Sequence, residues 1–394
     1  MPELSNAVVK LFLIFVSILL VSPAQAAPHI VIDLNSGHVL SHQQAFDLWH
    51  PASLTKLMTA YSAFRAIDIG TARADQPVRI SRNAAKQPPS RMGYRVGTTM
   101  TLDNALKLLV IKSANDVAVA IAESISGSVP AFSQRMMSDA ARLGMTDSSF
   151  VNPHGLHDRR QVTTARDMGL LVRALHQNYP QYKALFETPA VLAPSRTKNG
   201  KTIQRIYYSY NLLLERYRGA DGFKTGFVCA SGYNYIGAAS RSGRRIAAVV
   251  LGRDSQTSRA VDAAKFMTDG FQQPLQFGEL IGQLKPRGTV PSGPRNMRST
   301  LCTQKARAAR YEPGAGQAVI KSPWLLPRSI ERSPLTVSLL GRSTKLAALT
   351  RVPLPNFRRF NAIPSTSTPT KIETQAIAVT SDPQIPLPTF RPKT

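Results

Sequence analysis

The stretch from Ser53 to Ile69 constrains the fold more than any other, because it has the pattern of a helix that is apolar on nearly all sides. Its apolar side chains are spread widely around the helix instead of forming one stripe. A helix of this kind is buried at the centre of a domain, so other elements must surround it. With 394 residues, 43% of them hydrophobic, the chain is long enough for one large domain or two ordinary ones.

Strand patterns flank a series of helical patterns. Residues 29–42 predict two strands joined by a turn at "NSG", and residues 232–253 predict a second hairpin. Helical patterns cover residues 101–127 with a break near Lys112–Asn115, 131–143, 164–177 and 255–271. This order predicts an α/β fold in which one sheet is assembled from distant chain segments and packs against a cluster of helices.

The N-terminus has the pattern of a secretory signal peptide. Lys10 precedes an apolar run from Leu11 to Val21, and the small residues Ala24 and Ala26 fit a cleavage site after Ala26. The run is short for a membrane span. We therefore expect residues 1–26 to be a signal peptide and the rest to be exported. An uncleaved N-terminal anchor is the alternative.

The charge of the chain favours an anionic neighbour. There are 49 Lys and Arg against 23 Asp and Glu, a formal net charge of +26. No nucleic-acid-binding motif accompanies this charge, so we predict no nucleic-acid partner. From Ile281 onward the chain holds 18 basic against 4 acidic residues and 15 of the 28 prolines. This composition predicts a folded domain over residues 27–275, followed by a basic, largely disordered tail over 276–394.

Only two cysteines are present, Cys229 and Cys302. An exported chain could join them, but two cysteines do not make a disulfide framework, so the sequence leaves their pairing open. Neither has the spacing of metal ligands.

Ser53 and Lys56 share one face of the apolar helix, because residues three apart on a helix are neighbours. A serine hydroxyl becomes a nucleophile when a base accepts its proton, and a buried lysine can be that base when its pKa falls. The S-x-x-K pattern alone is weak, since a serine cap and a surface lysine would also produce it. Two further patterns follow in the chain, "SAN" at the helix break and "KTG" at a strand start. Their residues are Ser113, Ala114 and Asn115, and then Lys224, Thr225 and Gly226.

In an exported chain, the order S-x-x-K, S-x-N and K-T-G is typical of penicillin-interacting serine enzymes. The longer segments "HPASLTKLMTA", "IKSANDVAVAIAE", "FVNPHGLHD" and "DGFKTGFVCASGYN" resemble the low-molecular-mass penicillin-binding proteins. These are the D-alanyl-D-alanine carboxypeptidases of serine peptidase family S11. The resemblance spans roughly residues 28–272. It implies a β-lactamase/transpeptidase-like fold, with an antiparallel sheet packed against a helical cluster, and no cofactor.

The resemblance also implies a role for each residue of the three patterns. Ser53 would be the nucleophile, Lys56 its base and Ser113 the relay that protonates the departing D-alanine. Asn115, Lys224, Thr225 and Gly226 would hold the substrate, and the backbone N–H groups of Ser53 and Phe227 would form an oxyanion hole. Arg259 matches a position that helps to bind the terminal carboxylate. The implied substrates are peptidoglycan stem peptides, with β-lactams as inhibitors.

Several alternatives stay open. A D,D-endopeptidase of the same family would carry the same motifs and cut peptidoglycan cross-links. A class A β-lactamase needs a further carboxylate that activates water, which we do not find. His154 and His157 have an H-x-x-H spacing that could belong to a zinc peptidase, although no third ligand is evident. A non-catalytic envelope-binding protein is the last alternative.

We expect a periplasmic or cell-envelope location, with the basic tail near an anionic membrane or peptidoglycan surface.

Overall fold

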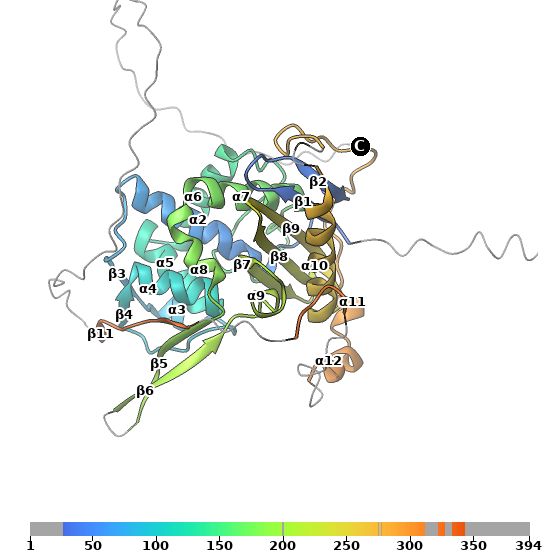
Figure 1. Ribbon diagram of the computed structural model, residues 1–394. Coiled ribbons are helices and arrows are strands. Elements are labelled where there is room, and N and C mark those ends of the chain that lie inside the picture. Colours follow the sequence, from blue (N-terminus) through green and yellow to red (C-terminus); the bar gives the residue numbers. More distant parts are fainter. Residues whose placement is uncertain are drawn as a thin grey trace, which may run out of the picture. The chain divides into compact units, whose positions relative to one another are not determined.

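Five antiparallel strands form the central sheet of this computed structural model, in the order β2-β1-β9-β8-β7 (Figure 1). The structure describes residues 27–198, 201–274, 276, 278–311, 322–327 and 333–342. The chain divides into units 1–352 and 353–394, and all the described residues belong to the first unit. The strands of the sheet are β1 (His29–Asp33), β2 (Val39–Gln43), β7 (Ala220–Val228), β8 (Gly232–Arg241) and β9 (Arg244–Arg253).

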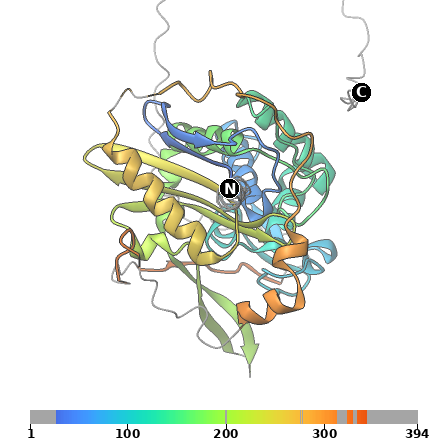
Figure 2. The ribbon, with the colours of Figure 1, turned by 90° about the vertical axis from the view of Figure 1, so that its right-hand side faces the viewer.

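Helices cover both faces of this sheet. Because side chains alternate along a strand, Ile30 and Ile32 of β1 face a large helical cluster while Val31 faces the opposite side. The cluster contains α2 (Thr55–Asp68), α5 (Asn115–Ser126), α6 (Val129–Arg142) and α7 (Ala165–Asn178). A single long helix, α10 (Gln256–Gln272), packs on the other face (Figures 1 and 2). The predicted sandwich and its sheet of distant segments are therefore confirmed.

Shorter elements complete the described part of the chain. Two small sheets lie beside the helical cluster, and their strand orders are β11-β4-β3 and β10-β5-β6. The strands are β3 (Pro77–Arg79), β4 (Thr98–Thr101), β5 (Ala190–Lys198), β6 (Lys201–Tyr208), β10 (Leu335–Thr336) and β11 (Gly341–Arg342). The helices and turns are η1 (Ala52–Leu54), α3 (Arg82–Ala85), α4 (Leu102–Lys107), η2 (Leu108–Lys112), η3 (Pro180–Tyr182), α8 (Lys183–Glu187), α9 (Leu213–Arg216), α11 (Arg298–Leu301) and α12 (Gln304–Tyr311).

The predicted boundaries need small corrections near the site. The helix expected from Ser53 begins at Thr55 and is preceded by a 3-10 turn, η1, which contains Ser53. The first helix of the pair in residues 101–127 ends in a π-helical turn, η2, at the predicted break. Lys224 does not start its strand, because β7 already begins at Ala220. β5 and β6 form a hairpin that the sequence did not predict.

Where the structure describes the predicted tail, the chain lies against the domain. Ile281 and Leu284 join the same core as the helical cluster, and Val337 does so further along. β10 pairs in parallel with β5, and a disulfide joins Cys302 to Cys229. These described residues are ordered, whereas the sequence predicted a largely disordered tail over residues 276–394. Single apolar side chains, short edge strands and a cross-link hold the segment in place, so its prolines need not interrupt any long element.

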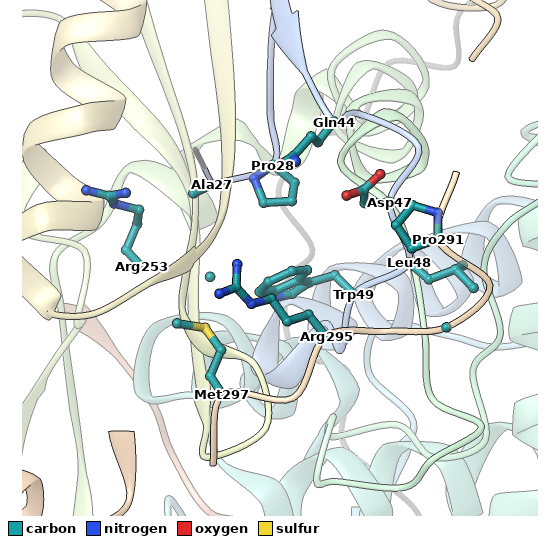
Figure 3. A pocket seen from close by; sticks show the side chains of 12 residues that line it. Ala27, Pro28, Gln44, Asp47, Leu48, Trp49, Arg253, Pro291, Arg295 and Met297 are labelled. Carbon is teal, nitrogen blue, oxygen red and sulfur yellow. The ribbon is translucent and has the colours of Figure 1, made fainter. Parts of the chain in front are cut away.

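A cavity of about 440 Å³ separates part of this C-terminal segment from the loop that follows β2 (Figure 3). Asp47 and Trp49 line it from the loop, and Arg295 and Met297 line it from the C-terminal segment. None of the predicted site residues lines this cavity. Within the described residues, no helix has the length and apolar character needed to cross a membrane.

Candidate active site

Ser53 and Lys56 meet as their spacing predicts. Lys56 Nζ lies 2.9 Å from Ser53 Oγ, because η1 and the first turn of α2 place the two side chains on one face. The ammonium also donates to Asn115 Oδ1 at 2.8 Å and to the backbone carbonyl of His154 at 2.7 Å. Lys56 is fully buried, and its Nζ atom has three hydrogen-bonding partners.

Burial controls the charge of Lys56. Loss of solvation lowers the pKa of Lys56 well below its ordinary value, and the positive charge of Lys224 lowers it further. Asp116 acts in the opposite direction, although its carboxylate is already bound by the backbone N–H groups of Met92, Gly93 and Val117. The site therefore favours a neutral amine beside a serine hydroxyl.

The "SAN" residues lie where η2 ends and α5 begins. Ser113 is buried and closes η2 in a left-handed backbone conformation. Asn115 accepts from Lys56 and donates from its amide to the carbonyl of Pro88 at 2.9 Å. This geometry makes Asn115 a positioning partner of Lys56, in addition to the substrate-holding role predicted for it. Among the described residues, the Ser113 hydroxyl makes no hydrogen bond that ties it to Lys56.

Gly226 brings strand β7 against η1, the 3-10 turn that precedes α2. A Cβ at this position would lie 3.0 Å from both the carbonyl oxygen of Pro51 and the backbone nitrogen of Ser53. Only a residue without a side chain allows this approach without displacing the backbone. β7 is an edge strand of the sheet, and the Phe227 ring packs against Tyr233 of β8. The structure thus places the KTG strand beside the serine.

Lys224, Thr225 and Arg259 are buried around the same strand. Lys224 Nζ donates to the carbonyl of Thr225, and Arg259 donates to the carbonyl of Gly226 at 3.2 Å. Burial, with Arg259 and Lys112 adding positive charge, lowers the pKa of Lys224 to about 7. Burial also lowers the pKa of Arg259 to about 10. No ion pair in the described part of the chain involves either cation, so the site is suited to an incoming carboxylate.

Sequence reasoning missed three contributors from other segments. His154 holds Lys56 through its backbone carbonyl, which leaves no side-chain signal. Asp116, next to Asn115, ties the loop at Met92 to the site through the backbone contacts above. The Asn234 amide donates to the carbonyl of His50 at 2.9 Å and so braces the segment before Ser53. Asn234 falls within the quoted segment "SGYN", but its partners could be found only from the fold.

The H-x-x-H residues are engaged differently from metal ligands. His154 Nδ1 accepts from the backbone N–H of Leu156, and burial lowers the pKa of the His154 ring to about 3. The His157 ring lies edge-on to His50, with centroids 4.7 Å apart. Within the described ranges, no three His, Cys, Asp or Glu side chains gather in a way that could hold a metal ion.

The sequence model of the peptidase S11 family, the D-alanyl-D-alanine carboxypeptidases, matches residues 21–255. The chain belongs to this family. It is 31% identical to D-alanyl-D-alanine carboxypeptidase DacC of Escherichia coli over 271 residues, which cover 66% of this chain and 64% of that relative. It is 32% identical to DacD of the same organism, over 65% of this chain and 67% of the relative. The chain thus spans about two thirds of the length of each of these two relatives.

Solved structures agree with this assignment. The carboxypeptidase DacD of Francisella tularensis superimposes with a TM-score of 0.60 at 28% identity, covering 63% of this chain and 70% of that chain. Penicillin-binding protein D2 of Listeria monocytogenes, in its cefotaxime-bound form, gives a TM-score of 0.55 at 29% identity, over 63% of this chain and 97% of that one. The β-lactamase/transpeptidase-like fold predicted from the sequence is therefore confirmed.

Proposed function

We propose that the chain is a serine-type D-Ala–D-Ala carboxypeptidase. It removes the terminal D-alanine from peptidoglycan stem pentapeptides through an acyl-serine intermediate, and penicillin acylates the same serine. One observation carries the proposal: the fully buried Lys56 amine lies 2.9 Å from Ser53 Oγ. Membership of the carboxypeptidase family and the cefotaxime-bound relative from Listeria support it.

The three partners of Lys56 suggest how the proton moves. Asn115 Oδ1 and the carbonyl of His154 only accept hydrogen bonds, so they orient the two N–H groups of a neutral amine. The remaining lone pair then faces Ser53 Oγ, where it can accept the hydroxyl proton as the oxygen attacks the peptide carbonyl. The lowered pKa of Lys56 shifts its equilibrium toward the neutral amine that carries this lone pair.

The remaining residues complete the cycle. The backbone N–H groups of Ser53 and Phe227 stabilise the oxyanion when the Oγ–C bond forms. The proton held by Lys56 passes through Ser113 to the departing amine as the amide C–N bond breaks. Water then attacks the acyl-serine by the reverse route, and Ser53 regains its proton. The substrate lies along β7 beside Thr225 and Gly226, and its terminal carboxylate binds Lys224 and Arg259.

The setting of this activity belongs to the same proposal. Residues 1–26, which lie outside the described residues, act as a signal peptide and direct the chain to the periplasm, where the enzyme takes part in cell-wall biogenesis and in cell shape. The Cys229–Cys302 disulfide supports an oxidising compartment. The basic residues after Ile281 hold the enzyme near anionic groups of the envelope.

Labelling with a fluorescent penicillin tests the proposal. Purified residues 27–394 should form a stable adduct that resists denaturation, and Ser53→Ala should form none. Ser62→Ala is the control, because Ser62 is a buried serine on α2, close in sequence to Ser53, and has no proposed role. Incubation with a pentapeptide muropeptide should then release free D-alanine. An adduct that persists in Ser53→Ala, or no adduct in the wild type, would refute the acyl-serine mechanism. Cleavage of cross-linked muropeptide dimers into monomers, without release of D-alanine from the pentapeptide, would identify an endopeptidase.

A further inference from the structure

Lys112 is a cation at the edge of the site that the mechanism does not use. It immediately precedes Ser113, at the end of η2, and is half-buried. Its ammonium lies 5.7 Å from the ring centroid of Tyr207 and 5.6 Å from that of Tyr210, both in the segment of β6 and the residues after it. No carboxylate pairs with it in the described part of the chain. The two rings thus hold a charged group in place without neutralising it.

The surroundings of Lys112 are basic. It is close enough to Lys224 to lower the pKa of that residue. The carbonyl of Tyr210, whose ring contacts Lys112, accepts from Arg259 at 3.5 Å. The guanidinium of Arg205 also lies near the Tyr207 ring, 5.6 Å from its centroid. A row of cations therefore runs from the proposed carboxylate site toward the β5–β6 hairpin, which projects from the domain in both views (Figures 1 and 2).

Three of these cations are buried or half-buried and have no acidic partner in the described part of the chain: Lys224, Arg259 and Lys112. Such a group of like charges is unfavourable until an anion approaches it. Lys224 and Arg259 account for one carboxylate, the C-terminal one of the substrate. Lys112 belongs to a different element, η2, while Tyr207 lies in β6 and Tyr210 shortly after it. A second anionic group on the same peptide would have to lie on this side of the cleft.

We infer that Lys112 binds a side-chain carboxylate on the substrate residue that precedes D-Ala–D-Ala, so that the enzyme prefers acidic stem peptides over the same peptides with that carboxylate amidated. Tyr207 and Tyr210 position the ammonium, and Arg205 extends the positive potential outward. The inference rests on the proposed function and deepens it by naming the class of stem peptide.

The simpler role for Lys112 is structural, in which its contacts with the two rings only fix the hairpin to η2. A third role is electrostatic, in which Lys112 lowers the pKa of Lys224 and so affects every substrate alike. Two peptides that differ in one charge separate these roles from direct binding. They are N-acetyl-aminoadipyl-D-Ala–D-Ala and its side-chain amide. Each is measured by kcat/KM for D-alanine release and by its competition with a fluorescent penicillin.

The wild type should prefer the acid over the amide by roughly 3- to 10-fold, as expected for one half-exposed charge pair. Lys112→Gln should lower kcat/KM for the acid by that factor and leave the amide unchanged, while Lys112→Arg should retain the preference. Lys265→Gln, which removes an exposed lysine on α10, is the control and should keep the wild-type preference.

The outcomes separate the two proposals. Absence of a penicillin adduct would overturn the proposed function itself. A normal adduct with equal competition by acid and amide would overturn only the inference about Lys112. An equal loss for both peptides in Lys112→Gln would also overturn it and assign Lys112 to the hairpin or to Lys224. The competition readout decides the question even if the enzyme cleaves neither short peptide.

Discussion

At the residue scale, Lys56 shows how one side chain depends on groups far apart in the sequence. Its spacing from Ser53 was visible in the motif, because residues three apart on a helix must be neighbours. Its other partners, Asn115 and His154, come from distant segments, and His154 contributes only backbone. The sequence therefore predicted the reactive pair but not the acceptors that orient the amine. A backbone carbonyl leaves no trace in residue type.

Lys224 should make the reaction depend on pH. Burial lowers the pKa of Lys224 to about 7, so it loses its charge as pH rises through that value. If the charged form binds the carboxylate, the second-order rate constant of penicillin acylation should fall above pH 7, approaching tenfold per pH unit. The rate constant is measured from pH 5 to 9.

Lys224→Arg provides the matched variant for this experiment. Arginine stays protonated over the whole range, so the alkaline decrease should vanish in this variant. If the rate constant still falls above pH 7 in Lys224→Arg, a group other than Lys224 causes the decrease.

At the scale of elements, the sequence predicted the long helices and the inner strands well, because their periodicity is strong. The β5–β6 hairpin was missed because residues 195–205 are almost all polar or charged, and the nearby apolar residues Ile203 and Ile206 remain exposed. No alternation between a buried and an exposed face marks it. The structured parts after residue 275 were missed for a related reason, since isolated anchors such as Ile281 create no period.

Gly226 is the residue through which β7 approaches η1. Gly226→Ala would add a Cβ 3.0 Å from backbone atoms of Pro51 and Ser53, and neither can move without displacing the serine. We expect penicillin acylation to slow by roughly 10- to 100-fold, since small displacements of reacting groups are costly. The melting temperature should change little.

The control for this prediction is Gly282→Ala, because a Cβ at Gly282 meets no atom within 4 Å. It should acylate at the wild-type rate. If Gly226→Ala does the same, the close approach of β7 is not needed for the chemistry.

At the scale of the whole chain, the positive charge is concentrated toward the C-terminus. The net charge of +26 draws heavily on residues after Ile281, and some of these lie on the described C-terminal segment. Lys285, Arg298 and Lys305 are exposed there. Because these cations lie on an ordered segment, part of the basic surface belongs to the folded domain. The predicted domain boundary at residue 275 excludes Ile281 and Leu284, which pack into the core.

Binding to isolated peptidoglycan tests the role of this charge. The full chain should bind in 50 mM salt and dissociate in 300 mM salt, because exposed charges are screened. Replacing Lys285, Arg298 and Lys305 by Gln should weaken binding roughly tenfold at low salt, since each exposed charge contributes up to about 1 kcal/mol. Binding is measured by co-sedimentation.

A triple variant of exposed cations in the helical region, Arg82, Lys86 and Arg142 to Gln, has the same change in net charge. It should bind more tightly than the first triple variant. Equal losses in both would mean that net charge alone, and not the C-terminal segment, holds the chain to peptidoglycan.

The position of β1 has a consequence for how the chain folds. β1 lies between β2, its sequence neighbour, and β9, which begins at Arg244. The central sheet therefore cannot close until more than 200 further residues have been made and brought back to the first strand. An incomplete chain would expose the unpaired edge of β1 and its apolar residues on both faces. Chaperone binding during synthesis should thus begin with the first hairpin and end only when β9 has joined it.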